Sequence, residues 1–242
     1  ERSDPSLFAT TRWSLVLTAG DPSSSQAAEA LEQLCRIYWY PVYGYVRGSG
    51  VGPEEARDLT QDFFARLIRK DFLAAVRQER GRFRWFLLCA VKRFLLNERD
   101  RASALKRGGT ARHIPFDGEK AERRYRLDAA HGDSPDRLFD RAWAADLMTT
   151  VYHQLEEEYA LEGKATLFNR LRALLSGDRL EVTYAELGTA LGMTEGAVKV
   201  AVHRARRRYR DLLRERVAGT LHSPADVEEE LRSLQAAFSP GV

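Results

Sequence analysis

Apolar side chains recur every three or four residues along most of the chain, and this spacing limits the possible fold more than any other feature. It matches the turn of an α-helix, whereas the β-branched residues are scattered and give almost no strand signal. From Ala27 onward, for example, Leu31, Leu34, Tyr38 and Val42 fall on one stripe. We therefore expect an all-α protein with two small helical domains, a three- to four-helix bundle and a helix-turn-helix domain, joined by a polar linker.

Breaks in this pattern predict the domain limits. A polar stretch rich in turn residues begins at Gly108 and continues to Pro135, and we expect at most a fragment of helix in it. Elsewhere the pattern predicts helices over about 27–46, 53–71, 83–101, 135–158, 164–175 and 183–190, and another from 194, with Pro41 kinking or interrupting the first. The predicted segments are an N-terminal extension (1–26), a first helical domain (27–112), a linker (113–135), a helix-turn-helix domain (136–216) and an acidic C-terminal tail (217–242).

Charge is strongly segregated along the sequence. The 242 residues carry 38 Lys and Arg against 35 Asp and Glu, a net charge of only +3. The basic residues nevertheless cluster over 80–112 and again over 194–216, with an acidic stretch between them. Clustered Arg and Lys displace counterions from a phosphate backbone, so two basic surfaces favour two contacts on one nucleic acid. Two solvated helix faces are the alternative.

Several other classes of function lack support in the sequence. Cys35 and Cys89 lie in apolar, helix-like stretches, where we expect buried, reduced thiols. Residues 1–11 lack the pattern of a signal peptide, and no run of about 18 apolar residues suggests a membrane span, so we expect a cytoplasmic protein without membrane contact. We find no glycine-rich phosphate loop, metal-ligand spacing or nucleophile elbow, and therefore expect no enzyme activity, no cofactor and no metal.

The segment from Thr183 to about residue 210 has the pattern of a helix-turn-helix. Thr183 and Glu186 form a capping box, which begins a short helix. Gly192 lies in the turn that follows, and Thr194 caps a second, strongly basic helix. The first residues of such a helix usually meet base edges, whereas its later arginines contact phosphates. An ordinary helical hairpin is the alternative.

A second motif mixes aromatic and basic residues. Gly81 is followed by Arg82, Phe83, Arg84, Trp85 and Phe86, directly before a basic helix. Rings can stack on unpaired bases while cations hold the backbone of a single strand, although aromatic residues are more often core. We expect Phe86 and Phe94 to be buried.

Three motifs in this order resemble those of a known family. They are Glu-Glu-Ala-Arg-Asp-Leu-Thr-Gln-Asp-Phe-Phe at 54–64, Phe-Arg-Trp-Phe-Leu at 83–87, and Thr-Tyr-Ala-Glu-Leu at 183–187 with Val-Lys at 198–199 and His-Arg-Ala-Arg at 203–206. Together they resemble bacterial RNA polymerase sigma factors of the extracytoplasmic-function class, over residues 27–112 and 136–216. The resemblance implies a transcription initiation factor that binds core RNA polymerase and promoter DNA, one domain melting and reading the minus-ten element and the other reading the minus-thirty-five element.

The resemblance also implies roles for individual residues. Those for polymerase binding are Glu55, Asp58, Gln61 and Asp62. Those for the minus-ten strand are Arg82, Arg84, Trp85, Lys92, Arg93 and Arg99, with the loop 78–85 holding an extruded base. Those for the minus-thirty-five element are Thr194, Glu195, Lys199, His203, Arg204, Arg206 and Arg207. The chain departs from the family pattern at Arg57, Arg93, Asn97 and Ala201.

Regulation is a further expectation. Because Arg57 replaces a frequent acid of the family, phosphorylation of Thr60 would restore negative charge to this helix. The partners implied are an anti-sigma factor or a Ser/Thr kinase. The acidic tail could fold back on the second domain, bind a regulator or remain disordered. Two other functions stay open, an autonomous helix-turn-helix regulator with a sensor or dimerisation domain, and an adaptor or anti-activator that binds protein.

Overall fold

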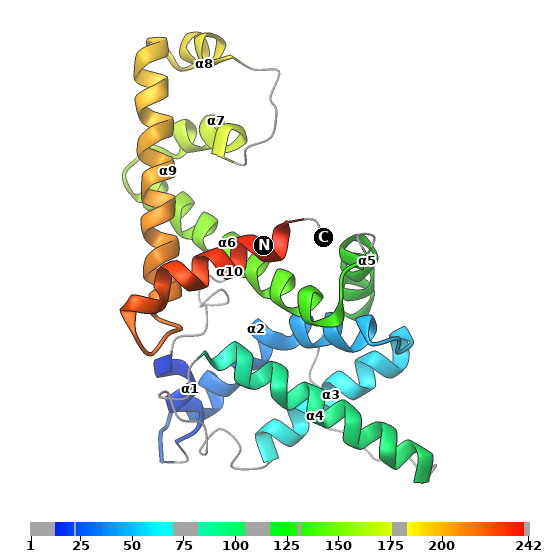
Figure 1. The fold of residues 1–242 in the computed structure, drawn as a ribbon. Coiled ribbons are helices and arrows are strands. Elements are labelled where there is room, and N and C mark those ends of the chain that lie inside the picture. Colours follow the sequence, from blue (N-terminus) through cyan, green and yellow to red (C-terminus); the bar gives the residue numbers. More distant parts are fainter. Residues whose placement is uncertain are drawn as a thin grey trace. The chain divides into compact units, whose positions relative to one another are not determined.

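Helices make up all the regular structure in the described part of the chain, which is residues 13–21, 23–69, 82–104, 117–129, 132–175 and 183–239 of a computed structural model (Figure 1). This confirms the all-α prediction. The helices are α1 (Trp13–Ala19), α2 (Ala27–Gly48), α3 (Pro53–Arg69), α4 (Phe83–Ala104), α5 (Gly118–Ala129), α6 (Pro135–Leu161), α7 (Ala165–Leu175), α8 (Tyr184–Leu191), α9 (Glu195–Ala218), the 3₁₀ turn η3 (Pro224–Asp226) and α10 (Val227–Phe238).

The chain divides into two compact units. The first unit combines the described residues up to Asp146 with those from Val217 onward, and the second comprises Leu147–Arg216. The limits fall within α6 and near the end of α9, so each of these helices contributes to both units. The structure therefore groups the start of α6 and the C-terminal segment with the first unit, whereas the sequence pattern separates them from it.

The core of the first unit is aromatic and centres on α2. Tyr38 contacts Phe83 of α4 edge-on at 5.5 Å between ring centroids and stacks on Phe139 of α6 at 6.3 Å. Trp13 of α1 also packs on Phe83, as expected for the apolar N-terminal extension. Pro41 lies inside α2 without ending it, although the sequence predicts a kink or an interruption there.

The cysteines do not share one environment. Cys35 is buried on α2, and burial, the main cause, together with the nearby Glu32 carboxylate raises the pKa of its thiol to about 12. Cys89 is exposed on α4, so the expectation of a buried thiol is wrong at this position. The buried Leu88 precedes it and the half-buried Ala90 follows, which means that an apolar stretch of sequence does not distinguish the inner and outer faces of this helix.

A 12-residue helix, α5, occupies part of the predicted linker. It packs on α2, where the Tyr40 hydroxyl donates to Asp128 at 2.5 Å and the Arg124 guanidinium lies 3.8 Å from the Tyr40 ring centroid. Ala121 is the buried residue of α5. The expectation of at most a helix fragment is wrong because hydrogen bonds and cation-π contacts dock this polar helix, and these leave no apolar period in the sequence.

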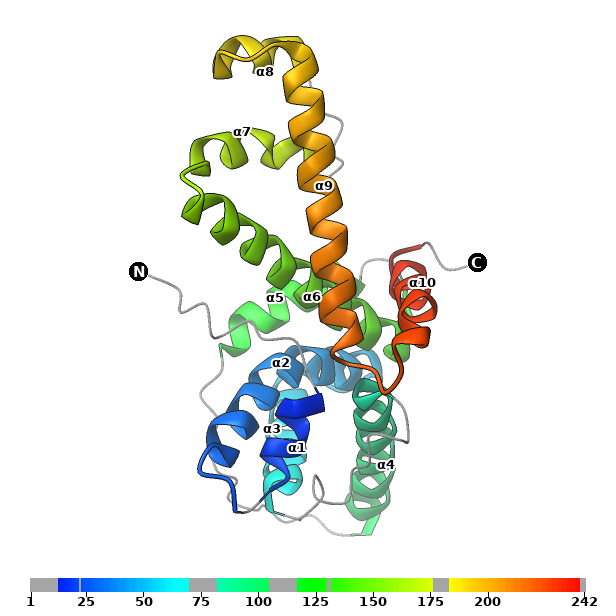
Figure 2. The same cartoon turned by 90° about the vertical axis from the view of Figure 1, so that its left-hand side faces the viewer.

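The C-terminal segment also forms a helix. α10 buries Leu234 and Ala237 together with the carboxylate-bearing Glu230, and the carbonyl of Ala236 accepts a hydrogen bond from Arg137 at 3.5 Å. Both ribbon views place α10 beside the first half of α6 (Figures 1 and 2). Of the alternatives that the sequence left open for the tail, disorder is thus wrong for residues 227–238. The helix packs within the first unit.

The second unit contains the end of α6 with α7, α8 and most of α9. Its core joins Leu171 of α7 to Leu187 of α8 and to Val198 and Val202 of α9.

In the described residues, no helix of the protein is both long enough and apolar enough to cross a membrane.

Candidate nucleic-acid interface

Local hydrogen bonds define both ends of α8. The Thr183 hydroxyl accepts from the Glu186 backbone N–H at 3.2 Å, while the Glu186 carboxylate accepts from the Thr183 N–H at 2.7 Å. These reciprocal bonds satisfy two backbone donors. The Thr183 N–H, and the Thr183 hydroxyl that also donates to the carboxylate at 2.9 Å, lower the pKa of Glu186. At the other end Gly192 has φ of 64°, a left-handed conformation that favours glycine. The predicted capping box and glycine turn are confirmed.

A second glycine sets how closely the turn can approach α8. A Cβ at Gly188 would lie 2.7 Å from the Met193 carbonyl oxygen, which is a backbone atom and cannot move cheaply. The Met193 N–H also donates to the Gly188 carbonyl at 2.8 Å, so the turn folds tightly against the helix. The Thr194 hydroxyl then accepts from the Ala197 N–H at 3.2 Å and caps α9. Gly188 is absent from the residues that we expected from the sequence to matter, although a glycine inside a helix is a signal of close packing.

The outer face of α9 is basic along much of its length. The apolar stripe of Val198, Val202 and Ala205 is buried, and basic side chains elsewhere on the helix are exposed. Lys199 pairs with Glu195 at 2.6 Å, one turn earlier. This α9 basic face is defined by its exposed residues Lys199, His203, Arg204, Arg206, Arg207 and Arg210. All the predicted minus-thirty-five residues are therefore exposed on one helix or at its N-cap.

A groove adjoins this face within the second unit. It has a volume of about 1220 Å³, and its described lining residues include no carboxylate. His203 and Arg206 come from α9, whereas His153 comes from α6 and Arg172 from α7. Arg206 also donates to the Leu174 carbonyl at 2.6 Å. The sequence analysis missed His153 and Arg172, because only the packing of three helices brings them beside α9.

Three of the predicted minus-ten residues have acidic partners. Arg84 is only 3% exposed, and its guanidinium pairs with Glu230 of α10 at 2.7 Å and with Asp140 of α6. Arg82 also pairs with Glu230, at 2.7 Å, and Lys92 pairs with Asp136 at 2.7 Å.

These pairs decide which cations can reach DNA in this conformation. Burial disfavours the charge of Arg84, but hydrogen bonds and attraction from its acidic partners outweigh burial and raise the pKa of the guanidinium. The expectation that Arg84 lies free at a DNA surface therefore does not hold for this conformation. The sequence gives no hint of this, since Glu230 lies 146 residues away.

The other predicted minus-ten residues are exposed. Trp85 is 56% exposed and Arg93 lies on the solvent side of α4. Arg99, also exposed, donates to the Ser49 carbonyl at 3.0 Å. Among the flanking aromatic residues, Phe94 is buried as predicted, whereas Phe86 is only half-buried. The predicted base-holding loop falls partly on residues 78–81, which lie outside the described residues.

A small cavity of about 210 Å³ lies between α3 and α4. Phe63 and Phe94 form part of its wall, and Asn97 and Arg93 contribute polar groups. The guanidinium of Arg66 lies 4.8 Å from the Phe94 ring centroid. The cavity thus combines apolar rings with cationic and amide edges.

The predicted polymerase-binding residues share α3 but differ in exposure. Glu55 and Asp58 are exposed, whereas Gln61 and Asp62 are half-buried. Thr60, the predicted phosphorylation site, is fully buried, and its hydroxyl donates to the Ala56 carbonyl at 2.7 Å. A kinase could reach this hydroxyl only after α3 separates from its neighbours, so the fold does not favour Thr60 as a phosphorylation site.

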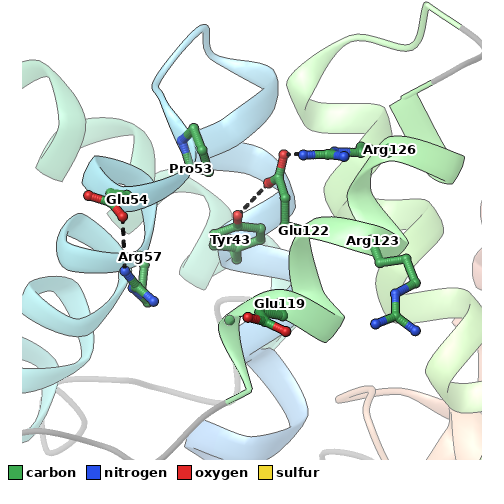
Figure 3. A pocket seen from close by; sticks show the side chains of 9 residues that line it. Tyr43, Pro53, Glu54, Arg57, Glu119, Glu122, Arg123 and Arg126 are labelled. Carbon is green, nitrogen blue, oxygen red and sulfur yellow. Dashed lines mark hydrogen bonds and ion pairs between the residues drawn. The ribbon is translucent and has the colours of Figure 1, made fainter.

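A pocket beside α5 has balanced charge. It lies among α2, α3 and α5, with a volume of about 350 Å³, and three arginines and three glutamates line it. Figure 3 shows Glu122 between Tyr43 and Arg126, and Glu54 turned toward Arg57. The Tyr43 hydroxyl donates to Glu122 at 2.6 Å. The charged residues of the lining therefore balance in formal charge.

Glu122 has a further partner outside the pocket. Arg47 donates to both of its carboxylate oxygens, each at 2.9 Å. The hydrogen bonds from Arg47 are the main cause that lowers the pKa of Glu122 to about 2, against the opposing effect of burial. This carboxylate therefore holds α5 on α2.

The described residues contain no cluster of three or more His, Cys, Asp or Glu side chains that could bind a metal ion. Comparisons of the chain with protein-family models, with curated proteins and with solved structures gave no match.

Proposed function

We propose that this protein is a transcription initiation factor that binds core RNA polymerase and directs it to promoters through minus-ten and minus-thirty-five DNA elements. The observation that carries the proposal is the helix-turn-helix of α8 and α9, with its capped start, its glycine turn and the α9 basic face. In this class of motif the second helix enters the major groove. An ordinary helical hairpin would not need a basic outer face on that helix.

The order of residues along α9 suits duplex recognition. Thr194 and Glu195 are at its start, where side chains can meet base edges. Arg204 and Arg207 follow two to three turns later and suit contacts to the phosphate backbone. The minus-thirty-five element is the duplex that we assign to this helix.

A second surface supports an initiation factor over a simple duplex-binding regulator. Trp85 offers an exposed ring on which an unpaired base can stack, and Arg93 and Arg99 add exposed cations on the same helix. A regulator that binds only duplex DNA has no need of such a surface. We assign it to the melted minus-ten strand.

The polymerase contact is assigned to α3. Glu55 and Asp58 are exposed on this helix, and short acidic side chains complement a basic partner surface. The test is Asp58→Lys, with Glu29→Lys as the matched control, since Glu29 is also exposed, lies on α2 of the same unit and undergoes the same charge reversal. We expect Asp58→Lys to weaken binding to core RNA polymerase about tenfold and Glu29→Lys to leave it within about twofold. Equal losses would contradict the assignment.

Duplex binding is tested through salt dependence. Arg207→Ala should lower the slope of log affinity against log salt by about 0.9 for a minus-thirty-five duplex, because one phosphate contact is lost. The autonomous regulator remains the rival function. Tight duplex binding by the protein alone, as a two-fold dimer and without any polymerase contact, would favour that rival.

A further inference from the structure

The C-terminal helix holds Arg82 and Arg84, two arginines that the resemblance to sigma factors implies for the minus-ten strand. Glu230 is 1% exposed and pairs with both Arg82 and Arg84, each at 2.7 Å. Glu229 adds a longer contact to Arg82 at 3.2 Å, and the Ser233 hydroxyl accepts from Arg84 at 3.3 Å. The first two turns of α10 therefore converge on this arginine pair.

We propose that α10 is an intramolecular clasp that occupies Arg82 and Arg84 in place of nucleic-acid phosphate, and that single-stranded DNA displaces it. The inference rests on the proposed function, because it concerns the regulation of the surface assigned to the minus-ten strand. A carboxylate and a phosphate present similar oxygen pairs to a guanidinium. The Glu230 carboxylate receives Arg84 through Nε at 2.7 Å and through Nη2 at 3.1 Å, which is the two-pronged geometry that a phosphate would also accept.

The network can lose α10 without leaving Arg84 unpaired. Asp140 of α6 also pairs with Arg84, and the guanidinium lies 5.3 Å from the Trp143 ring centroid. Both of these partners stay when α10 leaves. A buried arginine with a single partner would make release far more costly, since a buried charge without a partner is strongly disfavoured.

The apolar contact of α10 is small. Leu234 is its one large apolar side chain that is buried, Val227 and Leu231 are half-buried, and Phe238 remains 41% exposed. Acidic side chains thus contribute much of the attachment of this 12-residue helix. An attachment of this kind is sensitive to a competing polyanion, whereas a broad apolar interface is not.

The test compares two double variants of the full-length chain. Glu229→Gln with Glu230→Gln removes the two carboxylates that hold the arginine pair. Asp226→Asn with Glu228→Gln removes the same charge from exposed positions at the start of α10. Binding of a fluorescein-labelled 20-nucleotide single strand is followed by fluorescence anisotropy over a series of salt concentrations.

The clasp predicts tighter binding of the single strand to the first variant at every salt concentration, because the strand no longer has to displace two carboxylates from Arg82 and Arg84. The salt slope should stay close to that of the wild type, since the same phosphates are neutralised in both complexes. The second variant should bind with the affinity of the wild type. Equal affinities in the two variants would overturn the clasp.

A measurement on the wild type covers the case in which the first variant fails to fold. Hydrogen exchange of the amides of residues 227–238 should accelerate when the single strand saturates the protein, whereas unchanged protection would overturn the clasp.

Polymerase binding by the wild type separates the two proposals. If polymerase binds but the strand neither frees α10 nor binds more tightly to the first variant, the clasp alone fails. If the clasp results hold but polymerase does not bind, the initiation-factor proposal alone fails.

Discussion

Glu122→Gln tests how α5 is held on α2 within the first unit. The carboxylate side chain is 13% exposed and its partner Arg47 is 16% exposed. A pKa of about 2 instead of the ordinary 4.5 corresponds to about 3 kcal/mol at neutral pH, at about 1.4 kcal/mol for each pH unit. Since partial exposure screens the pair, we expect the variant to lose about 2 to 3 kcal/mol of unfolding free energy at pH 7.

The dependence on pH has a definite sign. The pKa of Glu122 is lowered in the folded state, so its contribution is complete above about pH 4.5 and disappears as the pH falls toward 2. The difference between wild type and variant should therefore shrink to about 1 kcal/mol at pH 3. A stabilisation that does not come from the carboxylate charge would give the same difference at both pH values.

Urea unfolding followed by tryptophan fluorescence is the assay. All four tryptophans lie in the first unit, which makes the signal specific for it: Trp13, Trp39, Trp85 and Trp143. Glu119→Gln is the matched control, because Glu119 is exposed on the same helix. It should change the unfolding free energy by less than about 0.5 kcal/mol. Equal unfolding free energies for wild type and Glu122→Gln at pH 7 would show that the Glu122 carboxylate does not stabilise the first unit.

Two further predictions concern single side chains. Gly188→Ala should destabilise the helix-turn-helix by about 1 to 3 kcal/mol, because the new Cβ meets the Met193 carbonyl. Gly196→Ala is the control and should be neutral or stabilising, because the space around Gly196 is open. Faster amide exchange in α8 and α9 of the Gly196→Ala protein would contradict this difference between the two glycines. Thr60→Glu should lower the unfolding free energy of the first unit by more than about 2 kcal/mol, because it places a charge in the core. Thr60→Val should lower it by less than about 1 kcal/mol, since only the hydrogen bond to the Ala56 carbonyl is lost. Amide hydrogen exchange in α8 and α9 measures the effect of the Gly188 variant, because the tryptophans all lie in the first unit. Urea unfolding followed by tryptophan fluorescence checks the two Thr60 variants, and a stable Thr60→Glu protein would show that α3 can accept a charge there.

Local signals in the sequence were enough to locate most of the helices. The predicted helix over 135–158 is α6 (Pro135–Leu161), and the capping box at Thr183 begins α8 as expected. Both depend on neighbouring residues, through the apolar period or through a backbone hydrogen bond. Such features can be read from a short segment.

Contacts between distant, charged residues could not be predicted in this way. The pairing of Arg84 with Glu230 and that of Arg47 with Glu122 join residues 146 and 75 positions apart. A charged residue on a predicted helix has many possible partners, and the apolar period does not choose among them. For this reason the sequence suggested a DNA-binding Arg84 and a linker with at most a fragment of helix, where the structure has a buried ion pair and the 12-residue helix α5.

Transcription from a library of randomised promoters tests the central proposal most directly. Purified core RNA polymerase is incubated with the library with or without the protein, and the transcripts are sequenced. The proposed function predicts transcripts that depend on the protein and begin at a fixed distance from two enriched sequence elements. Absence of such transcripts, together with tight binding of the protein alone to duplex DNA, would contradict it.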